Sequence, residues 1–368
     1  MLTQWKERLS DLLAAPDEVP APLSVPDKWI GHSVMHKAIR RGNVALACAA
    51  GTAMLTIDRS GLWKRLMTIA CEDVGIGDEE VLIACAAAAD DGPWRTRMGE
   101  ARVVTTLCRL LAEAEKDRSA DNMICAARTH PGLEHFREMA GSRPVAERLE
   151  LVEDKALPLP ARAVAAWYAS GVEWWPERRV GPGDLDGLLD ACQGLGASAD
   201  LVAATRIAVR KVHEPIVLMP ALLSSAARGS VCETIPWEPP PAEPINGLPP
   251  CVFDRFTRTG KQAIARFARE NEPVRTLLET LAPDRRWSAV MAYGVFHAEG
   301  GRLGKRLVWR DALMLERLGL EADFLPEGIG PDDFTRLIAT VESQLDHLNA
   351  IRARIVADTF PPAQGQLL

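Results

Sequence analysis

The sequence lacks the short motifs that usually mark an enzyme or a membrane protein. It contains no C-x-x-C pair, no G-x-x-x-x-G-K-[ST] phosphate loop and no G-x-S-x-G nucleophile motif. The nearest string to a phosphate loop, Thr259 to Gln262, lacks the upstream glycine and the hydroxyl that would hold magnesium. No apolar run reaches the length of a membrane span. We therefore expect no catalytic residue, no metal and no cofactor, and a protein that is not an enzyme.

Tyrosine and long alternating apolar runs are also scarce. Only two Tyr occur in 368 residues, while Ala, Leu and Arg are plentiful, so strands should be few. The eight cysteines are scattered, and most lie in apolar helical stretches, which is typical of buried thiols in a reducing compartment. The opening stretch MLTQWKERLSDLLAAPDE mixes charges and does not resemble a signal peptide. We expect a cytoplasmic protein with no membrane contact.

Hydrophobic periodicity predicts an all-α protein, a multi-helix array or bundle in two helical domains. Seven prolines between 236 and 250 favour an extended linker and mark the boundary. A single long helix is expected from Pro331 to Ala357. The predicted divisions are an N-terminal helix with a proline-rich connector (1–27), a first helical domain (28–235), the linker (236–250), a basic helical domain (251–357) and a disordered tail (358–368).

The most informative stretch runs from Lys37 to Gly77. From Leu62 its apolar residues recur every three or four positions, as on one helix face, and Ser60 is the predicted N-cap. Glu72 and Asp73 stand near the C-terminal end, where the helix dipole disfavours negative charge. A cation from another helix, or Arg65 two turns earlier, would compensate them in a salt-bridged network. The alternative is a solvated helix end that contributes little to stability.

This stretch resembles a known family. HKAIRRGNVALAC followed by DRSGLWKRLMTIACEDVGIGD is similar to the C-terminal helical region of clamp-loader-like, replication-associated recombination ATPases of bacteria, over residues 30 to 90 and more weakly to 170. The matching positions are Lys64, Arg65, Leu66, Ile69, Ala70, Glu72, Asp73, Val74, Gly75 and Asp78. The resemblance implies a helical fold and oligomer contacts beside DNA, with Arg65, Glu72, Asp73 and Gly75 as an interface or structural motif. Only about 30 residues precede the segment, so the family's ATPase module is not expected here.

The segment beyond the linker is locally basic. Between Cys251 and Arg310 there are twelve Lys and Arg against six Asp and Glu, although the whole chain carries a net charge of −7. Clustered cations of this kind neutralise phosphates. Gly300, Gly301 and Gly304 would let the backbone approach a phosphate chain. The candidate nucleic-acid-binding residues are Arg258, Lys261, Arg266, Arg269, Arg285, Arg286, Arg302, Lys305 and Arg306. The alternative is a solvated surface balanced by the acidic first domain.

Other candidates favour structural roles. His32 and His36 have a spacing that can bind zinc, but no third ligand is near in the sequence. Asp254 either caps the next helix or belongs to a phosphate site at that helix start, and capping is preferred. A catalytic centre would require a deep pocket that combines carboxylates with histidines from the set His130, His135, His213 and His297.

These observations lead to two functional hypotheses. The first is a non-catalytic factor of DNA replication, recombination or repair that binds DNA or a DNA-bound partner. Replication or repair proteins are expected as partners, and a homo-oligomer is expected from the resemblance. The second is a protein-interaction scaffold or accessory subunit that does not bind nucleic acid.

Overall fold

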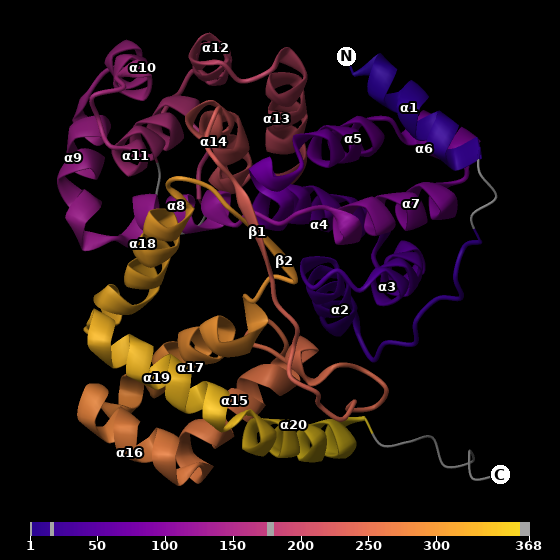
Figure 1. The fold of residues 1–368 in the computed structure, drawn as a ribbon, viewed down its shortest axis with the longest axis vertical. Helices are drawn as coiled ribbons and strands as arrows, with labels where there is room; N and C mark the ends of the chain where they lie inside the picture. Colours follow the sequence, from indigo (N-terminus) through magenta and orange to yellow (C-terminus); the bar gives the residue numbers. More distant parts are fainter. Residues whose placement is uncertain (1, 15–17, 175–179, 361–368) are drawn as a thin grey trace.

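The computed structural model describes residues 2–14, 18–174 and 180–360, and these residues form an all-α fold (Figure 1). The helices of the first half are α1 (Thr3–Ala14), α2 (Lys28–Arg40), α3 (Val44–Ile57), α4 (Arg59–Ile69), α5 (Glu79–Asp90), α6 (Gly92–Met98), α7 (Glu100–Glu113), α8 (Ser119–Thr129), α9 (Glu134–Ser142), α10 (Val145–Glu153), α11 (Leu159–Ser170), α12 (Leu185–Leu195), α13 (Ala199–Val212) and α14 (Met219–Ala227). Short helical turns among them include the π-helix η1 (Ala70–Val74), η2 (Gly75–Gly77), η3 (Pro131–Leu133) and η4 (Pro215–Leu218).

The second half contains fewer and more amphipathic helices. They are α15 (Arg258–Glu270), α16 (Glu272–Leu281), α17 (Trp287–Val295), α18 (Ala312–Phe324), α19 (Pro331–Ser343) and α20 (Leu345–Thr359). The short turns are η5 (Pro250–Val252), η6 (Asp284–Arg286), the π-helix η7 (Phe296–Gly300) and η8 (Leu325–Glu327), and the strands are β1 (Glu233–Pro236) and β2 (Lys305–Val308).

Two hydrophobic clusters hold these helices together. The first cluster takes its buried residues mainly from α1 to α14, and the second from α15 to α17, α19 and α20. Helix α18 bridges them, because its Leu315 and Ala322 belong to the first cluster and its Phe324 to the second. Figure 1 shows α18 crossing from α8 toward α19. The division predicted at 236–250 stays a prediction, and the structure adds that α18 packs mainly on the side of the first cluster.

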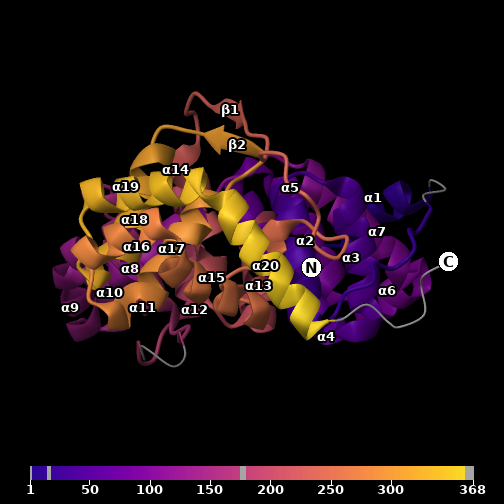
Figure 2. The same ribbon diagram turned by 90° about the horizontal axis from the view of Figure 1, so that it is seen from below.

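An antiparallel pair of strands in the second half is hydrogen-bonded to Lys116 of the first half. Strand β1 pairs with β2, with Thr234 opposite Leu307. The backbone N–H of Lys116 donates to the carbonyl of Lys305 at 2.8 Å, so the loop between α7 and α8 joins this ribbon. Figure 2 shows the ribbon at one edge of the molecule. The proline-rich segment that follows β1 packs on the body of the protein, since its Ile245 and Leu248 are buried.

Two predicted helix details are wrong. Asp58, rather than Ser60, caps α4, because the Asp58 carboxylate accepts the Gly61 N–H at 3.1 Å. The long C-terminal helix is broken at Gln344, whose φ of −116° and ψ of 13° leave the helical region. The Gln344 side chain accepts a hydrogen bond from Asn271 at 2.9 Å, which holds the junction between α19 and α20 against α16.

Membrane contact was not expected from the sequence. Within the described parts of the chain, the helices are too short or too polar to cross a bilayer.

Candidate functional site

A buried ionic network lies where α2, η1 and α8 meet. Arg40 donates through Nε to both oxygens of Asp73 at 3.0 and 2.9 Å and through Nη2 to Glu72 at 2.9 Å. Arg118 donates to Glu72 at 3.0 Å and to Asp73 at 2.7 Å. His36 completes the set, with its Nε2 2.8 Å from Asp73. The Asp73 side chain is fully buried, so these partners replace the water it would otherwise need.

Two π-helical turns frame this network. The first, η1, carries Glu72 and Asp73, and the second, η7, presents the Gly300 carbonyl, which accepts from Arg40 Nη1 at 2.6 Å. Both arginines also lie over the Phe296 ring of η7, at 5.7 Å for Arg40 and 5.3 Å for Arg118. π-Helical turns are rare and occur frequently at functional sites. Because two such turns meet at one ionic network, we take this region as the candidate functional site.

Gly75 has a conformational role at the end of η1. Its φ of +51° favours glycine, and a Cβ there would lie 2.9 Å from the Asp117 carbonyl oxygen. The Asp117 N–H in turn donates to the Asp73 carbonyl at 2.9 Å. This close approach brings the start of α8, and with it Arg118, against the acidic pair.

The predicted pairing of Arg65 with Glu72 is wrong. Glu72 binds Arg40 and Arg118 instead, and no ion pair of Arg65 is found within the described chain. The π-turn explains the difference, because it winds more residues into each turn than an α-helix and rotates Glu72 away from the line of Arg65. Arg40 and Arg118 were not anticipated as partners, because they lie 32 and 46 residues from Glu72 and no spacing along one helix connects them to it.

The network shifts the pKa values of its members. Burial lowers the pKa of His36, so its imidazole is neutral near pH 7. Burial alone would raise the pKa of Asp73, but the charges of Arg40 and Arg118 together with the contact from His36 outweigh it and hold this pKa well below its usual range. Burial raises the pKa of Asp121 to about 6 despite its ion pair with Arg118. Three acids therefore share two arginines, and Asp121 is the weakest acid of the three.

The same residues have the spacing of a metal site. Ligand atoms of His36, Glu72 and Asp73 all lie within 4.8 Å of one another. The two carboxylates already bind the guanidinium groups of Arg40 and Arg118, so a divalent cation would meet two positive charges at close range. The arrangement is a salt-bridge network, and we assign no metal to it. His32, whose spacing from His36 can bind zinc, lies with its Nε2 3.2 Å from Asp58 instead.

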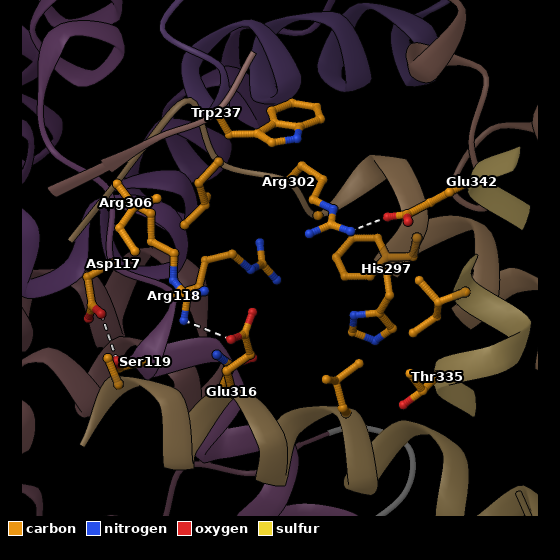
Figure 3. A pocket seen from close by; sticks show the side chains of 18 of the residues that line it. Asp117, Arg118, Ser119, Trp237, His297, Arg302, Arg306, Glu316, Thr335 and Glu342 are labelled. Carbon is orange, nitrogen blue, oxygen red and sulfur yellow. Dashed lines mark hydrogen bonds and ion pairs between the residues drawn. The ribbon is translucent and has the colours of Figure 1, made fainter. Parts of the chain in front are cut away.

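A cavity of about 480 Å³ opens beside the network, at the seam of the two halves (Figure 3). The guanidinium groups of Arg118, Arg302 and Arg306 extend toward the same open space, and Trp237 lies at its edge (Figure 3). Apolar side chains complete its walls: Phe296, Leu303, Leu320, Phe334 and Ile338.

Carboxylates in the cavity wall pair with two of its arginines. Arg302 binds Glu342, and Arg306 binds Glu316 at 2.8 Å. These pairs are partly exposed, so each is worth at most about 1 kcal/mol. Arg118 differs, since its guanidinium is fixed by the buried network. The cavity therefore combines one fixed arginine with two that can exchange partners.

Asp117 is the most unusual acid of the cavity wall. One of its oxygens accepts from Ser119 Oγ at 2.7 Å, while Oδ2 is buried without a hydrogen-bond partner. Burial raises the pKa of Asp117 to about 6. Trp309 Nε1 donates to the same Ser119 hydroxyl at 3.1 Å, which fixes the geometry of this corner.

The nine predicted nucleic-acid-binding residues fall into two groups. The first group, which we name the α15 face, consists of Arg258, Lys261, Arg266 and Arg269, all exposed on one helix. At 100° per residue they span an arc of about 140°, opposite the buried Ile264 and Phe267. In the described chain no carboxylate lies within 4.0 Å of the first three, and Arg269 lies 3.4 Å from Asp284.

Asp284 belongs to η6, which also contains Arg285 and Arg286. The ion pair between Arg269 and Asp284 therefore brings these two cations close to the end of the α15 face. Arg286 donates to the Glu327 carbonyl at 2.8 Å, whereas Arg285 is exposed. The second group is separate: Arg302 and Arg306 line the cavity, and Lys305 stands beside them on β2. The structure therefore presents one exposed cationic helix face and one arginine-lined cavity.

Three glycines that were expected to approach a phosphate meet protein instead. A Cβ on Gly301 would lie 3.1 Å from the Phe296 ring, and one on Gly304 would lie 2.6 Å from the Arg41 carbonyl oxygen. A Cβ on Gly300 would likewise lie 3.3 Å from the Phe296 ring. Gly304 lets the turn before β2 pack closely on Arg41 after α2, and Gly300 and Gly301 leave room for the Phe296 ring of η7.

The expected role of Asp254 as a helix cap is wrong. Thr257 caps α15, accepting the Gly260 N–H at 3.1 Å, and Asp254 forms a buried ion pair with Lys37 of α2. The candidate histidines do not meet in one pocket. His297 lines the cavity and lies 2.8 Å from Asp323, whereas His130 lies 3.0 Å from Glu321.

Comparisons with known proteins add no relative. No protein-family model matches the chain, and searches of curated proteins and of solved structures find no match.

Proposed function

We propose that this protein is a non-catalytic factor associated with DNA replication, recombination or repair that binds DNA or a DNA-bound partner. The observation that carries the proposal is the α15 face. Its four cations are exposed on one side of one helix, and three of them have no carboxylate partner in the described chain. Side chains arranged in this way are available to replace the counterions of a phosphate backbone.

The length of the α15 face suits a nucleic-acid strand. From Arg258 to Arg269 the helix rises by about 16 Å, which spans several phosphates of one strand. The buried Ile264 and Phe267 anchor the opposite side of the helix in the second cluster, so the cations sit on a rigid element. The resemblance of residues 30–90 to clamp-loader-like ATPases supports a DNA-associated setting, with replication or repair proteins as partners and a homo-oligomer as the assembled form.

The test is the salt dependence of DNA binding. Fluorescence anisotropy with labelled duplex and single-stranded DNA, from 50 to 200 mM NaCl, gives the slope of log K against log salt. If all four cations contact phosphates, alanine at Arg258, Lys261, Arg266 and Arg269 should reduce the magnitude of this slope by about 3 to 4 for duplex DNA.

The control removes the same charge elsewhere. Lys64, Lys155, Arg210 and Lys211 are exposed cations of the first half, and their joint replacement by alanine should leave the slope unchanged. Equal losses in the two quadruple variants would mean that only total charge matters. Undetectable binding of the native protein at 50 mM salt would refute the proposal.

The alternative is a protein-interaction scaffold that does not bind nucleic acid. It is favoured by exposed apolar side chains on α18, where Leu313 is 59% exposed and Met314 40%. A pull-down after nuclease treatment separates the two functions, because a scaffold retains its protein partner when DNA is removed. Loss of capture in a Leu313→Ser, Met314→Ser variant would locate that partner on α18.

A further inference from the structure

The arginine-lined cavity is the feature that the proposed DNA contact leaves unused. It lies at the seam of the two clusters, away from the α15 face, and none of the α15 cations lines it. Its volume of about 480 Å³ falls within the usual range for small-molecule sites. Five separate parts of the chain supply its walls, namely 117–122, 235–237, 296–306, 312–320 and 334–342.

We propose that this cavity binds one nucleotide, with the phosphate on Arg302 and Arg306 and the base against Trp237 and Phe296. The inference goes beyond the proposed function, since a free nucleotide can bind here whether or not the protein binds DNA. The source of the nucleotide is either a free mononucleotide or a unit of a single strand, and both present the same chemistry.

The phosphate contact follows from the arginines. Arg302 and Arg306 come from the loop before β2 and from β2 itself, and each pairs with one partly exposed carboxylate across the cavity. A phosphate offers two or three acceptor oxygens at once, so it can receive a guanidinium fork at two of them, as a carboxylate does, and still accept from a further donor. Breaking a partly exposed ion pair costs little free energy, so a phosphate can replace the carboxylates as the acceptor for Arg302 and Arg306.

The base contact follows from the aromatic side chains. The Arg41 guanidinium lies 5.5 Å from the centre of the Trp237 ring, and the Arg118 guanidinium lies 5.3 Å from the centre of the Phe296 ring. Both rings also line the cavity. Each ring is therefore held in place by a cation and contributes surface to the open space. Aromatic surfaces of this kind stack with any base.

The rigidity of the wall supports a preformed site. Phe296 and His297 belong to the π-helix η7, and the Gly301 N–H donates to the Phe296 carbonyl at 2.7 Å. His297 is fixed by Asp323 at 2.8 Å. Asn122 and Thr335 add polar groups that can meet the edge of a base.

The experiment is isothermal titration calorimetry of the full chain with dAMP, dTMP, deoxyadenosine, inorganic phosphate and a short oligo-dT strand. We expect both mononucleotides to bind more tightly than deoxyadenosine or phosphate alone. Trp237→Ala should weaken the nucleotides by about 5- to 100-fold, and Trp237→Phe should recover most of this loss. Arg302→Ala with Arg306→Ala should weaken the nucleotides at least tenfold and leave deoxyadenosine unchanged.

Matched controls lie outside the cavity. Trp29→Ala removes an exposed tryptophan of α2, and Arg336→Ala an exposed arginine of α19, and neither should change binding. Binding of free mononucleotides assigns a small-molecule site. Binding of oligo-dT alone assigns a unit of a strand to the cavity only if the quadruple α15 variant still binds it and Trp237→Ala weakens it. The quadruple α15 variant should retain mononucleotide binding, which separates this test from that of the proposed function.

Two results would overturn the inference. The first is no heat of binding for any mononucleotide at millimolar concentration, with none for oligo-dT in the quadruple α15 variant. The second is binding of a diamine such as putrescine without any nucleotide, which would assign the site to Glu316 and Glu342 rather than to the arginines. Unchanged nucleotide affinity in folded Trp237→Ala and Arg302→Ala, Arg306→Ala proteins would likewise move the ligand elsewhere.

Discussion

Replacing Arg40 by methionine tests whether the buried network holds the fold together. The Arg40 side chain is 3% exposed and bonds to Asp73, Glu72, His36 and the Gly300 carbonyl. Methionine fills a similar length but removes every one of these bonds. Asp73, which has no contact with water, would then depend on Arg118 and a neutral His36.

The expected loss is about 3 to 5 kcal/mol in the free energy of unfolding, the usual cost of removing one partner of a buried ion pair. Urea unfolding followed by far-UV circular dichroism at pH 7.5 measures it. The second variant, Asp73→Asn on the Arg40→Met background, removes one uncompensated charge. It should recover at least about 2 kcal/mol, because the remaining acids then again face comparable positive charge.

An exposed pair supplies the control. Arg354 binds Glu270 at 2.9 Å with its side chain 55% exposed, so Arg354→Met should cost less than about 1 kcal/mol. If Arg40→Met costs no more than Arg354→Met, burial does not give the network its strength and the reasoning fails. If Asp73→Asn adds a further loss instead of a recovery, the charge count of the network is wrong.

Two further predictions concern pH and packing. Asp117 has a pKa of about 6 in the folded protein against 3.8 ordinarily, so between these values the folded state binds more protons and the stability of the protein falls as the pH rises. The free energy of unfolding of Asp117→Asn should therefore increase by up to about 3 kcal/mol relative to the native protein between pH 4 and 8. A difference in urea titrations that does not depend on pH would contradict this. Gly304→Ala should lower the melting temperature by several degrees, because its Cβ would lie 2.6 Å from the Arg41 carbonyl oxygen. Gly330→Ala is the control and should change the melting temperature little, since no atom lies within 4 Å of its Cβ. Equal shifts of the two variants in calorimetry would show that the backbone near Gly304 moves to accept the Cβ at no cost in stability.

The helical architecture was predictable because its signal is local. On α15, Ile264 and Phe267 face inward while Lys261 and Arg266 face outward, and this spacing is visible in the sequence alone. The exposed cationic face could be anticipated for the same reason. The ends of helices were less predictable, since the cap of α4 moved from Ser60 to Asp58.

The partners of the acidic pair were not predictable in the same way. An acidic helix end signalled that cations were needed, but the cations come from positions 40 and 118, each more than thirty residues from Glu72. The π-turn that aims Glu72 at them has no signature that periodicity reveals. The cavity was also missed, because its walls come from five parts of the chain.

The sequence by itself determined which segments are helical and which of their faces are apolar or charged, since both follow from spacing along one helix. The tertiary structure alone decided that α2, η1, η7 and α8 meet at one ionic network and that a cavity remains beside it. The physical reason is that an ion pair or a cavity depends on where separate helices come to rest against one another. That position is set by the packing of two hydrophobic clusters and not by any one segment.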